Sequence, residues 1–234
     1  MKRAMICSLL ALAALVSCRG QQHPIEVYVD PRFTDADNAE NVEKIAVLNC
    51  ATSLHSTEDP DNVAPATVEK FLVPALDLRT DYKFIAPNTV EYAVGQNGWD
   101  ERYQKFLRSF AVSGKPDLAF ITDLAHQLQC DGFLIPVVDL WQKDEADITE
   151  NTTPATYVGA TITILSARDG VALFRAIDED YEEGARTETG DRSLVTSGSG
   201  AVYADLGRKV HRAPPFEDVA SKVARALANS LPAR

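Results

Sequence analysis

The fold is decided by the stretch YVGATITIL (residues 157–165) and the two segments after it, SARDG (166–170) and VALFRAI (171–177). In the first segment apolar residues alternate with Thr161 and Thr163, which is the pattern of a half-buried antiparallel strand. The Arg-Asp-Gly sequence in the second segment favours a hairpin turn. The third segment is therefore expected to return as the neighbouring strand.

Outside this hairpin, short apolar runs alternate with segments of helical spacing. The apolar runs predict buried strands and are KIAVLN (44–49), YKFIAP (82–87) and GFLIPVVDL (132–140). Apolar residues three and four apart predict helices over 63–79, 99–110 and 117–128, and a last helix that opens at Pro214 and Pro215. The predicted order is β-α-β-α-β-β-β-α. It indicates an α/β domain, a two-layer or three-layer sandwich, whose mixed sheet joins three parallel strands to the antiparallel hairpin.

Two prolines and a short N-terminal run predict local features of this domain. Pro136 has no backbone N–H to donate, so it predicts a bulge or a sheet edge in the strand over 132–140. Pro74 is expected to bend or end the helix over 63–79. Residues 25–29 alternate in character and are expected to add an edge strand.

The chain begins like a secretory leader. Lys2 and Arg3 precede an apolar stretch over 4–16, and residues 15–18 read LVSC. These four residues resemble a bacterial lipobox, in which the cysteine is lipidated before cleavage. We therefore expect a signal peptide over 1–17, lipidation of Cys18, a lipidated tether over 18–43 and a single α/β domain over 44–234. The apolar stretch is shorter than the roughly 20 residues of a spanning helix, so the lipid would anchor the chain to the membrane.

The residue after the cysteine predicts which membrane holds the chain. In Gram-negative lipoproteins an Asp at that position commonly retains the protein at the inner membrane, whereas this chain has Arg19. By this resemblance, the predicted location is the periplasmic face of the outer membrane.

Composition limits the class of partner. Apolar residues make up 45% of the chain, which is enough for a substantial core, and the net charge is −11 at pH 7. The phosphates of nucleic acid repel an acidic protein, so nucleic acid is excluded as a partner. A basic protein partner fits the charge.

The cysteines are not expected to pair. Cys7 would leave with the leader and Cys18 would carry lipid, which leaves Cys50 and Cys130. Cys50 ends the first predicted strand, and Cys130 precedes a strand parallel to it. The two are therefore expected at opposite ends of the sheet, beyond the roughly 7 Å between Cα atoms that a disulfide tolerates.

One candidate binding surface is aromatic. The predicted helix over 99–110 carries an aromatic face at steps of three and four residues, made of Trp99, Tyr103, Phe106 and Phe110. Such a face either covers the core of its own domain or binds a partner. The sequence leaves both interpretations open.

A second candidate surface is acidic. Asp178, Glu179 and Asp180 follow the predicted strand over 171–177, and other acidic residues fall at the same end of the sheet: Glu58, Asp59, Asp61, Asp144, Glu145, Asp147 and Glu150. Charge runs usually form a solvated rim. The alternatives are a docking face for a basic partner or a weak divalent-cation site. Neutralising Asp178, Glu179 and Asp180 is expected to leave the melting temperature nearly unchanged, because exposed charges contribute little to stability.

Residues 184–212 are rich in Gly, Ser, Thr and charged residues, which predicts a long mobile excursion that serves as a contact surface. Its alternating runs at 194–196 and 201–203 are shorter than the 9–11 residues, roughly, of an outer-membrane strand. A pore-forming hairpin is therefore the second interpretation of this segment.

Catalytic motifs are absent from the sequence. The histidines, at positions 23, 55, 126 and 211, lack the spacing of zinc ligands, and neither a nucleophile motif nor a phosphate-binding loop occurs. We therefore predict no catalytic residue, no metal and no cofactor, and the chain is not expected to be an enzyme.

Three segments together resemble a known family. KIAVLNC (44–50), LAHQLQCDGFLIPVV (124–138) and ATYVGATITILSARDGVALF (155–174) are similar to envelope lipoproteins of the CsgG-like, LpoB-like and PelC-like group. The domain shared by that group also resembles the N-terminal domain of TolB. The resemblance covers about residues 44–177 and the final helix, and its motifs are structural. Pro136 departs from the glycine that is usual in the family.

The resemblance implies a role without catalysis. Members of the group assemble secretion pores, stimulate cell-wall synthases or scaffold envelope machines. The expected function is that of an outer-membrane-anchored periplasmic lipoprotein that assembles, scaffolds or activates an envelope complex. The alternative is a subunit of an oligomeric secretion or export apparatus. The expected partners are envelope proteins, which include basic proteins and further copies of this chain.

Overall fold

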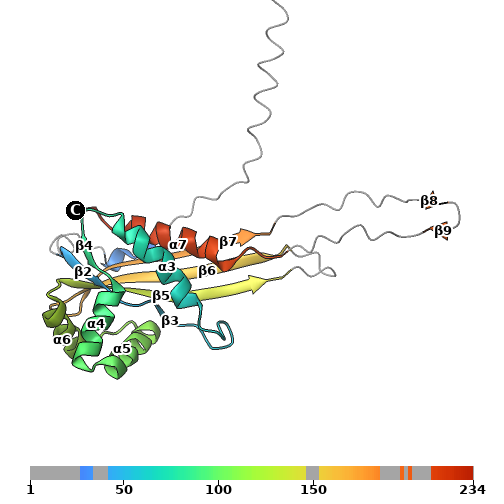
Figure 1. Cartoon of the computed structure of the whole chain (residues 1–234). Coiled ribbons are helices and arrows are strands. Elements are labelled where there is room, and N and C mark those ends of the chain that lie inside the picture. Colours follow the sequence, from blue (N-terminus) through green and yellow to red (C-terminus); the bar gives the residue numbers. More distant parts are fainter. Residues whose placement is uncertain are drawn as a thin grey trace, which may run out of the picture.

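Three long strands form an antiparallel meander in the computed structural model, which describes residues 27–33, 42–145, 153–184, 196–197, 200–201 and 212–233. They are β5 (Gly132–Asp144), β6 (Ala155–Ser166) and β7 (Ala172–Glu183). The turn from β6 to β7 contains Gly170 with a φ of 68°, a backbone conformation that favours glycine. The predicted hairpin is confirmed, and both of its strands are longer than predicted (Figure 1).

Parallel strands extend the meander on the side of β5. β2 (Lys44–Val47) lies between β5 and β4 (Lys83–Ile85) and is parallel to both, with Ile45 opposite Gly132 and Phe84. β3 (Ala51–Thr52) continues the line of β2 and is also parallel to β5. The mixed sheet predicted from the sequence is confirmed, with the strand order β1-β7-β6-β5-β2-β4.

Pro136 lies inside the sheet, and its missing N–H faces an interruption in the neighbouring strand. Two alternate carbonyls of β5 accept hydrogen bonds from that side: Leu134 from the Leu48 amide at 2.9 Å, and Val138 from the Ser53 amide at 3.0 Å. Pro136 lies two residues from each of them, so its backbone faces the same neighbouring strand. At that point the neighbouring strand is interrupted between β2 and β3, so the missing N–H of Pro136 costs the sheet no hydrogen bond. The irregularity within β5 itself comes slightly later, between Val138 and Leu140.

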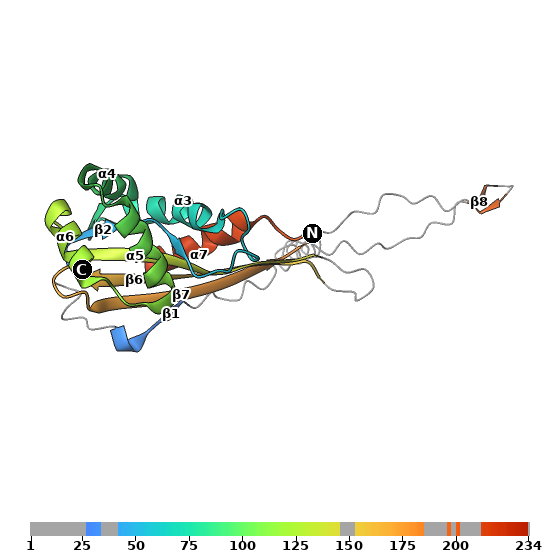
Figure 2. The same ribbon diagram turned by 90° about the horizontal axis from the view of Figure 1, so that it is seen from below.

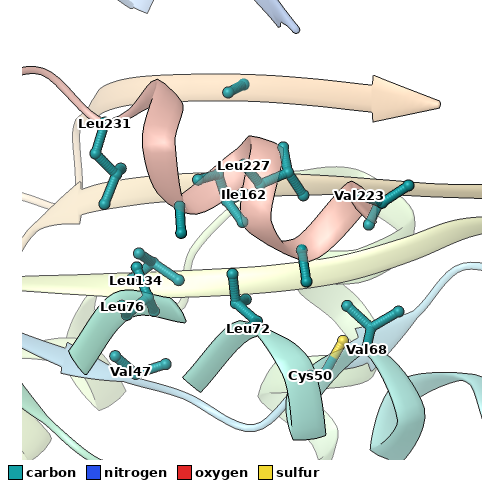
Figure 3. Packing of buried hydrophobic residues seen from close by; sticks show 14 of the residues in the cluster. Val47, Cys50, Val68, Leu72, Leu76, Leu134, Ile162, Val223, Leu227 and Leu231 are labelled. Atoms are coloured by element: carbon teal, nitrogen blue, oxygen red, sulfur yellow. The ribbon is translucent and has the colours of Figure 1, made fainter. Parts of the chain in front are cut away.

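Two helices cover one face of the sheet. They are α3 (Ala64–Asp77) and α7 (Phe216–Ser230), and their apolar residues interlock with those of β2, β5 and β6 (Figure 3). The labelled core residues from these elements include Leu72, Leu76, Val223, Leu227, Leu134 and Ile162. α3 continues three residues past Pro74, so the proline does not end this helix.

An arginine ties the ends of these two helices together. Arg79, just after α3, donates from Nη1 to the carbonyls of Ala228 (3.2 Å) and Leu231 (3.0 Å), and from Nη2 to that of Pro232 (2.9 Å). Carbonyls at a helix C-terminus have no partner within the helix, so these bonds satisfy acceptors that would otherwise need water.

Three helices cover the opposite face, which gives a three-layer sandwich. They are α4 (Pro87–Asn97), α5 (Asp100–Ser113) and α6 (Leu118–Leu128). The Asp117 carboxylate caps α6 by accepting from the Phe120 amide at 3.1 Å, as predicted for a helix that starts after Asp117. α4 was not predicted from the sequence. Its buried face is small, and only Pro87, Val90, Ala93 and Val94 contribute to it.

The helices on this face gather over one end of the sheet. Figure 2 shows strands β6 and β7 continuing well past α4, α5 and α6. At the far end of the meander, Asp144 pairs with Ala155, which in turn pairs with Glu183. The long strands therefore present a stretch of sheet that these three helices leave uncovered.

A short strand borders the sheet beside β7. β1 (Tyr28–Val29) pairs antiparallel with it, with Tyr28 opposite Ile177, and a 3-10 turn, η2 (Pro31–Phe33), follows. The predicted edge strand is thus present at residues 28–29, Val27 is described and lies outside the strand, and residues 25–26 lie outside the described residues. Within the predicted excursion, β8 (Thr196–Ser197) pairs antiparallel with β9 (Gly200–Ala201).

Several predictions for the ends of the chain lie outside the described residues. These are the signal peptide, Cys18, most of the tether over 18–43 and most of the excursion over 184–212. In the part of the chain that the structure describes, every helix is too short or too polar to cross a bilayer.

Cys50 and Cys130 are free, buried thiols, as the predicted topology requires. Cys50 belongs to the core between the sheet and α3 and α7, and Cys130 belongs to the core on the other face. Burial raises the pKa of both thiols, that of Cys130 to about 11. Both are therefore protonated near neutral pH.

The core on the α3 and α7 face predicts a measurable contrast between two leucines. Leu72 is fully buried, whereas Leu78 is 84% exposed at the end of the same helix. Leu72→Ala should lower the free energy of unfolding by about 2–5 kcal/mol because it leaves a cavity. Leu78→Ala should change it by less than about 0.5 kcal/mol. Urea denaturation followed by circular dichroism measures both, and equal effects would contradict the described packing.

Candidate functional site

A cavity of about 310 Å³ opens on the sheet face that carries α5. Its floor is formed by side chains of β5, β6 and β7, and its walls come from η2, from the residue after β3 and from the C-terminal end of α5. We call it the Arg175 pocket, and its lining consists of Phe33, Ser53, residues 110–114, Val137, Asp139, Thr161, Thr163, Ala172 and Arg175.

The strand register brings the polar floor residues together. Thr163 of β6 lies directly opposite Arg175 of β7, and Thr161 lies opposite Val137 of β5. The irregularity between Val138 and Leu140 places Asp139 beside Thr161, whose Oγ1 donates to Asp139 Oδ2 at 2.8 Å. Both threonines are buried, so the polar groups of this floor are set into the sheet.

Gly159 is required beside this cluster because there is no room for a side chain. A Cβ at that position would lie 2.9 Å from Asp139 Oδ1 and 3.0 Å from Glu179 Cγ. Glycine therefore lets two carboxylate side chains approach each other across β6. Loss of surrounding water raises the pKa of Asp139, the Thr161 hydroxyl opposes that rise, and the charge of Glu179 adds to it.

Arg175 is the cation of the pocket. Its Nε is buried and has no hydrogen-bond partner. Among the described residues its guanidinium forms no ion pair. Its charge acts only weakly on Asp30, whose pKa is lowered mainly by Arg32, and on Asp139, whose pKa burial raises. The pocket thus combines an unpaired guanidinium with a lining of both polar and apolar residues.

The nearest carboxylate on the β1 side is already occupied. Asp30 accepts from Arg32 Nε at 3.0 Å and from Arg32 Nη2 at 2.6 Å, and Arg32 holds the pKa of this carboxyl at about 2. Such a bidentate pair leaves little capacity for a second arginine. Asp30 therefore does not take up the donors of Arg175.

A larger groove of about 880 Å³ lies at the opposite end of the sheet, next to the turn between β6 and β7. Two of its carboxylates serve the backbone: Asp131 accepts from the Lys44 amide at 2.9 Å, and Asp169 accepts from the Val171 amide at 3.2 Å. Its buried thiol, Cys130, is protonated near neutral pH. These groups already have structural partners, so the Arg175 pocket is the stronger candidate.

The acidic residues proposed as one docking face are divided between two faces of the sheet. β7 continues to Glu183, so the alternation of side chains continues through Asp178, Glu179 and Asp180. Glu179 lies on the side of the Arg175 pocket, where it raises the pKa of Asp139. Asp178 and Asp180 lie on the α7 side, where the charge of Lys222 lowers the pKa of Asp180 against the larger effect of burial.

The premise that these three residues are exposed is wrong for Asp178. Only 2% of Asp178 is exposed, and burial, followed by the charges of Asp180 and Glu179, raises its pKa to about 7. The Oδ2 atoms of Asp178 and Asp180 are buried without a hydrogen-bond partner. Neutralising Asp178 should therefore change stability, contrary to the expectation from the sequence.

The other acidic residues have mixed positions. Asp144 and Glu145 lie at the far end of the meander, near Glu183, as predicted. Asp59 instead caps α3, since its oxygens accept from the amides of Val63 (3.0 Å) and Ala64 (2.8 Å). Asp147 and Glu150 lie outside the described residues. Among the described residues, acidic, histidine and cysteine side chains form no group of three or more suited to a metal ion.

The aromatic face of α5 covers the core. Tyr103, Phe106 and Phe110 are between 2% and 4% exposed. The rings of Tyr103 and Phe106 pack on Phe120 of α6, and that of Phe110 packs on Phe106. Trp99 is half-buried and forms a T-shaped pair with Phe120. A partner would need these rings at the surface. The interpretation of Tyr103, Phe106 and Phe110 as an exposed binding stripe is therefore wrong, and the core interpretation holds.

The sequence did not single out the pocket residues. Arg175 and Asp139 are isolated charged residues in the apolar runs ALFRAI and GFLIPVVD, which are assigned to buried strands. A charge within such a run is the available signal, because buried charges need a partner. That the two residues face one cavity depends on the pairing register, which the sequence does not state.

The chain is similar to several solved structures, at low sequence identity. Solved structures with a similar fold include lipoprotein GNA1162 from Neisseria meningitidis, the PelC dodecamer from Paraburkholderia phytofirmans and the LpoB C-terminal domain from Escherichia coli. GNA1162 is 15% identical, covers 63% of this chain and 88% of its own, and has a TM-score of 0.44. PelC is 14% identical, covers 89% of this chain and 98% of its own, and has a TM-score of 0.42.

LpoB is 11% identical, with 59% of this chain and 82% of its own covered and a TM-score of 0.32. PelC and LpoB, which the predicted resemblance names, are thus among the solved structures that the chain is similar to. No family model matches the chain. No curated protein matches it either.

Asp178 predicts a specific dependence of stability on pH. Its pKa in the folded chain lies above the ordinary value of 3.8, so the folded state holds the proton more tightly than the unfolded state. The resulting stability is fully present below about pH 4 and is lost as the pH rises through 7. Relative to the wild type, Asp178→Asn should therefore gain about 1–3 kcal/mol between pH 4 and 8.

Urea denaturation at a series of pH values measures this difference. Glu183→Gln is the matched control on the same strand, because Glu183 is exposed and is not among the charges that raise the pKa of Asp178, and its stability should run parallel to that of the wild type. A constant difference between wild type and Asp178→Asn over this pH range would show that Asp178 does not titrate as described.

Proposed function

We propose that this protein is a lipid-anchored component of the periplasmic face of the outer membrane and acts by binding, as an assembly, scaffold or activator subunit of an envelope complex. The observation that carries the proposal is the LVSC sequence at 15–18, placed directly after an apolar stretch with a basic start. The likeness of fold to envelope lipoproteins supports the same class.

The chemistry of the Arg175 pocket supports binding. A guanidinium, a carboxylate held by a threonine hydroxyl and an apolar wall are groups that recognise and orient a ligand. Both described thiols have raised pKa values, which disfavours the thiolate that a cysteine nucleophile needs. The proposal is therefore a protein that works by contact.

The length of the tether limits where such a protein acts. Because β1 already belongs to the sheet, only residues 19–27 separate Cys18 from the domain, and they span at most about 30 Å when fully extended. A partner would therefore be reached close to the membrane surface.

An export-apparatus subunit is the second candidate. The pairing of β8 with β9 within the excursion favours it, since a hairpin at that point is what an inserted strand pair would require. Each of these strands has two residues, far from the 9–11 residues, roughly, that cross an outer membrane. The assembly, scaffold or activator role therefore stays the first candidate and the export-apparatus subunit the second.

Lipidation at Cys18 is the direct test of the anchor. Metabolic labelling with palmitate should mark the wild type and the Cys7→Ser variant, whose altered residue lies inside the leader, and should not mark Cys18→Ser. Mass spectrometry of the mature N-terminus should show a diacylglyceryl cysteine. A water-soluble product that begins after residue 18 would overturn the anchor.

Arg19 tests the choice of membrane. The outer-membrane assignment predicts that Arg19→Asp moves the lipidated protein to the inner-membrane fraction of a sucrose gradient, while Arg19→Lys leaves it in the outer-membrane fraction. The wild type in the inner-membrane fraction would contradict the assignment.

The binding role is tested by crosslinking in living cells. The wild type should give discrete crosslinked complexes with envelope proteins that are lost when Cys18→Ser removes the anchor. A turnover-dependent activity of the purified protein would instead assign it to the enzymes.

A further inference from the structure

Arg175 is a charged group whose hydrogen bonds are incomplete. Its Nε is buried without a partner, and the residues that the structure describes offer its guanidinium no ion pair. A buried donor without an acceptor costs about 1–3 kcal/mol, and more when it is charged. Such groups in folded proteins commonly mark a site whose partner comes from outside.

The two acidic neighbours of Arg175 are engaged elsewhere. Asp30 is held by Arg32 at 2.6 and 3.0 Å, and Asp139 accepts the Thr161 hydroxyl at 2.8 Å. Neither lies within 4.0 Å of a nitrogen of Arg175, which is the limit for an ion pair. The guanidinium therefore retains its donors for a ligand in the pocket.

The walls of the pocket define the rest of the ligand. Phe33, Phe110, Val137 and Ala172 contribute apolar surface around the guanidinium. The volume of about 310 Å³ is at the small end of ligand pockets, which suits one or two amino-acid residues. The last turn of α5, residues 111–113, also lines the pocket, and helix carbonyls there have no helical partner and accept an N–H group.

Charge selects between anions. A guanidinium binds carboxylate and phosphate alike, in a bidentate manner. Asp139 and Glu179 lie on the same sheet face as Arg175, so a dianionic phosphate is repelled more strongly than a carboxylate with one charge. The favoured ligand therefore carries a single carboxylate, an apolar side chain and an amide N–H.

We propose that the Arg175 pocket binds the C-terminal residue of a partner polypeptide, whose carboxylate pairs with the guanidinium of Arg175. The proposal rests on the proposed binding function and specifies its ligand. The chain's own C-terminal segment is not the occupant, because the Pro232 carbonyl is held on the other face by Arg79 (2.9 Å) and Tyr82 (3.0 Å). A free carboxylic acid shares part of the chemistry and is distinguished in the test.

The test uses the full-length protein in detergent and isothermal titration calorimetry. The probe is the peptide acetyl-Ala-Ala-Phe with a free carboxylate, and the comparison probes are its C-terminal amide, phenylacetate and inorganic phosphate. The free peptide should bind saturably, at least about tenfold more tightly than its amide and than either small anion. Equal binding of the amide would overturn the proposal, and equal binding of phenylacetate would overturn its polypeptide part.

Variants place the binding at Arg175. Arg175→Lys keeps a positive charge but loses the forked geometry, and Arg175→Met removes the charge. Both should weaken binding of the free peptide by at least about tenfold, whereas Arg168→Gln, which changes an exposed arginine in the turn after β6, should not. Unchanged binding in both Arg175 variants would overturn the proposal. If Arg175→Met does not show cooperative unfolding and is therefore not folded, the Arg175→Lys variant and the amide probe still test whether the peptide carboxylate binds at Arg175.

Two further outcomes separate the competing explanations. The sequence after Phe33 contains Asp35 and Asp37. Peptide binding that appears only after both are changed to Asn would show that these carboxylates compete for the guanidinium, and would overturn the proposal. Envelope crosslinks that persist in Arg175→Met, together with no peptide binding by the wild type, would overturn this inference and leave the proposed function standing.

Discussion

β6, the central strand of the meander of β5, β6 and β7, is buried on both faces along most of its length, and the rest of the structure depends on this. In β6 every side chain from Val158 to Leu165 is buried, with one set facing α3 and α7 and the other set facing α5. A strand enclosed in this way accepts polar side chains only where a partner or a cavity is provided. The position of each polar residue in the meander therefore depends on its register as much as on its type.

That constraint explains why the charged residues of the meander fall into separate groups. Arg175, Asp139 and Glu179 share the face of α5, where the cover by helices ends and a cavity remains. Asp178 and Asp180, one position away, lie under α7, where neither Oδ2 finds a donor. Asp178, Glu179 and Asp180 are adjacent in the sequence but lie in two different environments. Glu179 is exposed on the face of the Arg175 pocket, whereas Asp178 and Asp180 are covered by α7.

The sequence predicted the elements with strong periodicity and failed where a local pattern was weak or misleading. The hairpin, the parallel strands and the helix after Pro215 are confirmed, because each buries a regular apolar set. α4 was missed since few of its residues are apolar, and β7 was ended at Ile177 since six largely acidic residues rarely continue a strand. The Arg175 pocket was out of reach because Asp139, Thr161 and Arg175 meet only through cross-strand pairing and an irregularity in β5.

The hydrogen bonds between Arg79 and the C-terminal end of α7 affect when the chain can fold. α7 is the last helix along the chain, yet it supplies half of the helical cover over one face of the sheet, and the carbonyls that Arg79 binds belong to residues 228–232. Until those residues are available, Leu72 and Leu76 lack the neighbours that bury them. If the chain is exported as proposed, the part that emerges first cannot close its core early. An arrangement of this kind delays folding until translocation is complete, so the chain stays unfolded while it passes through the membrane.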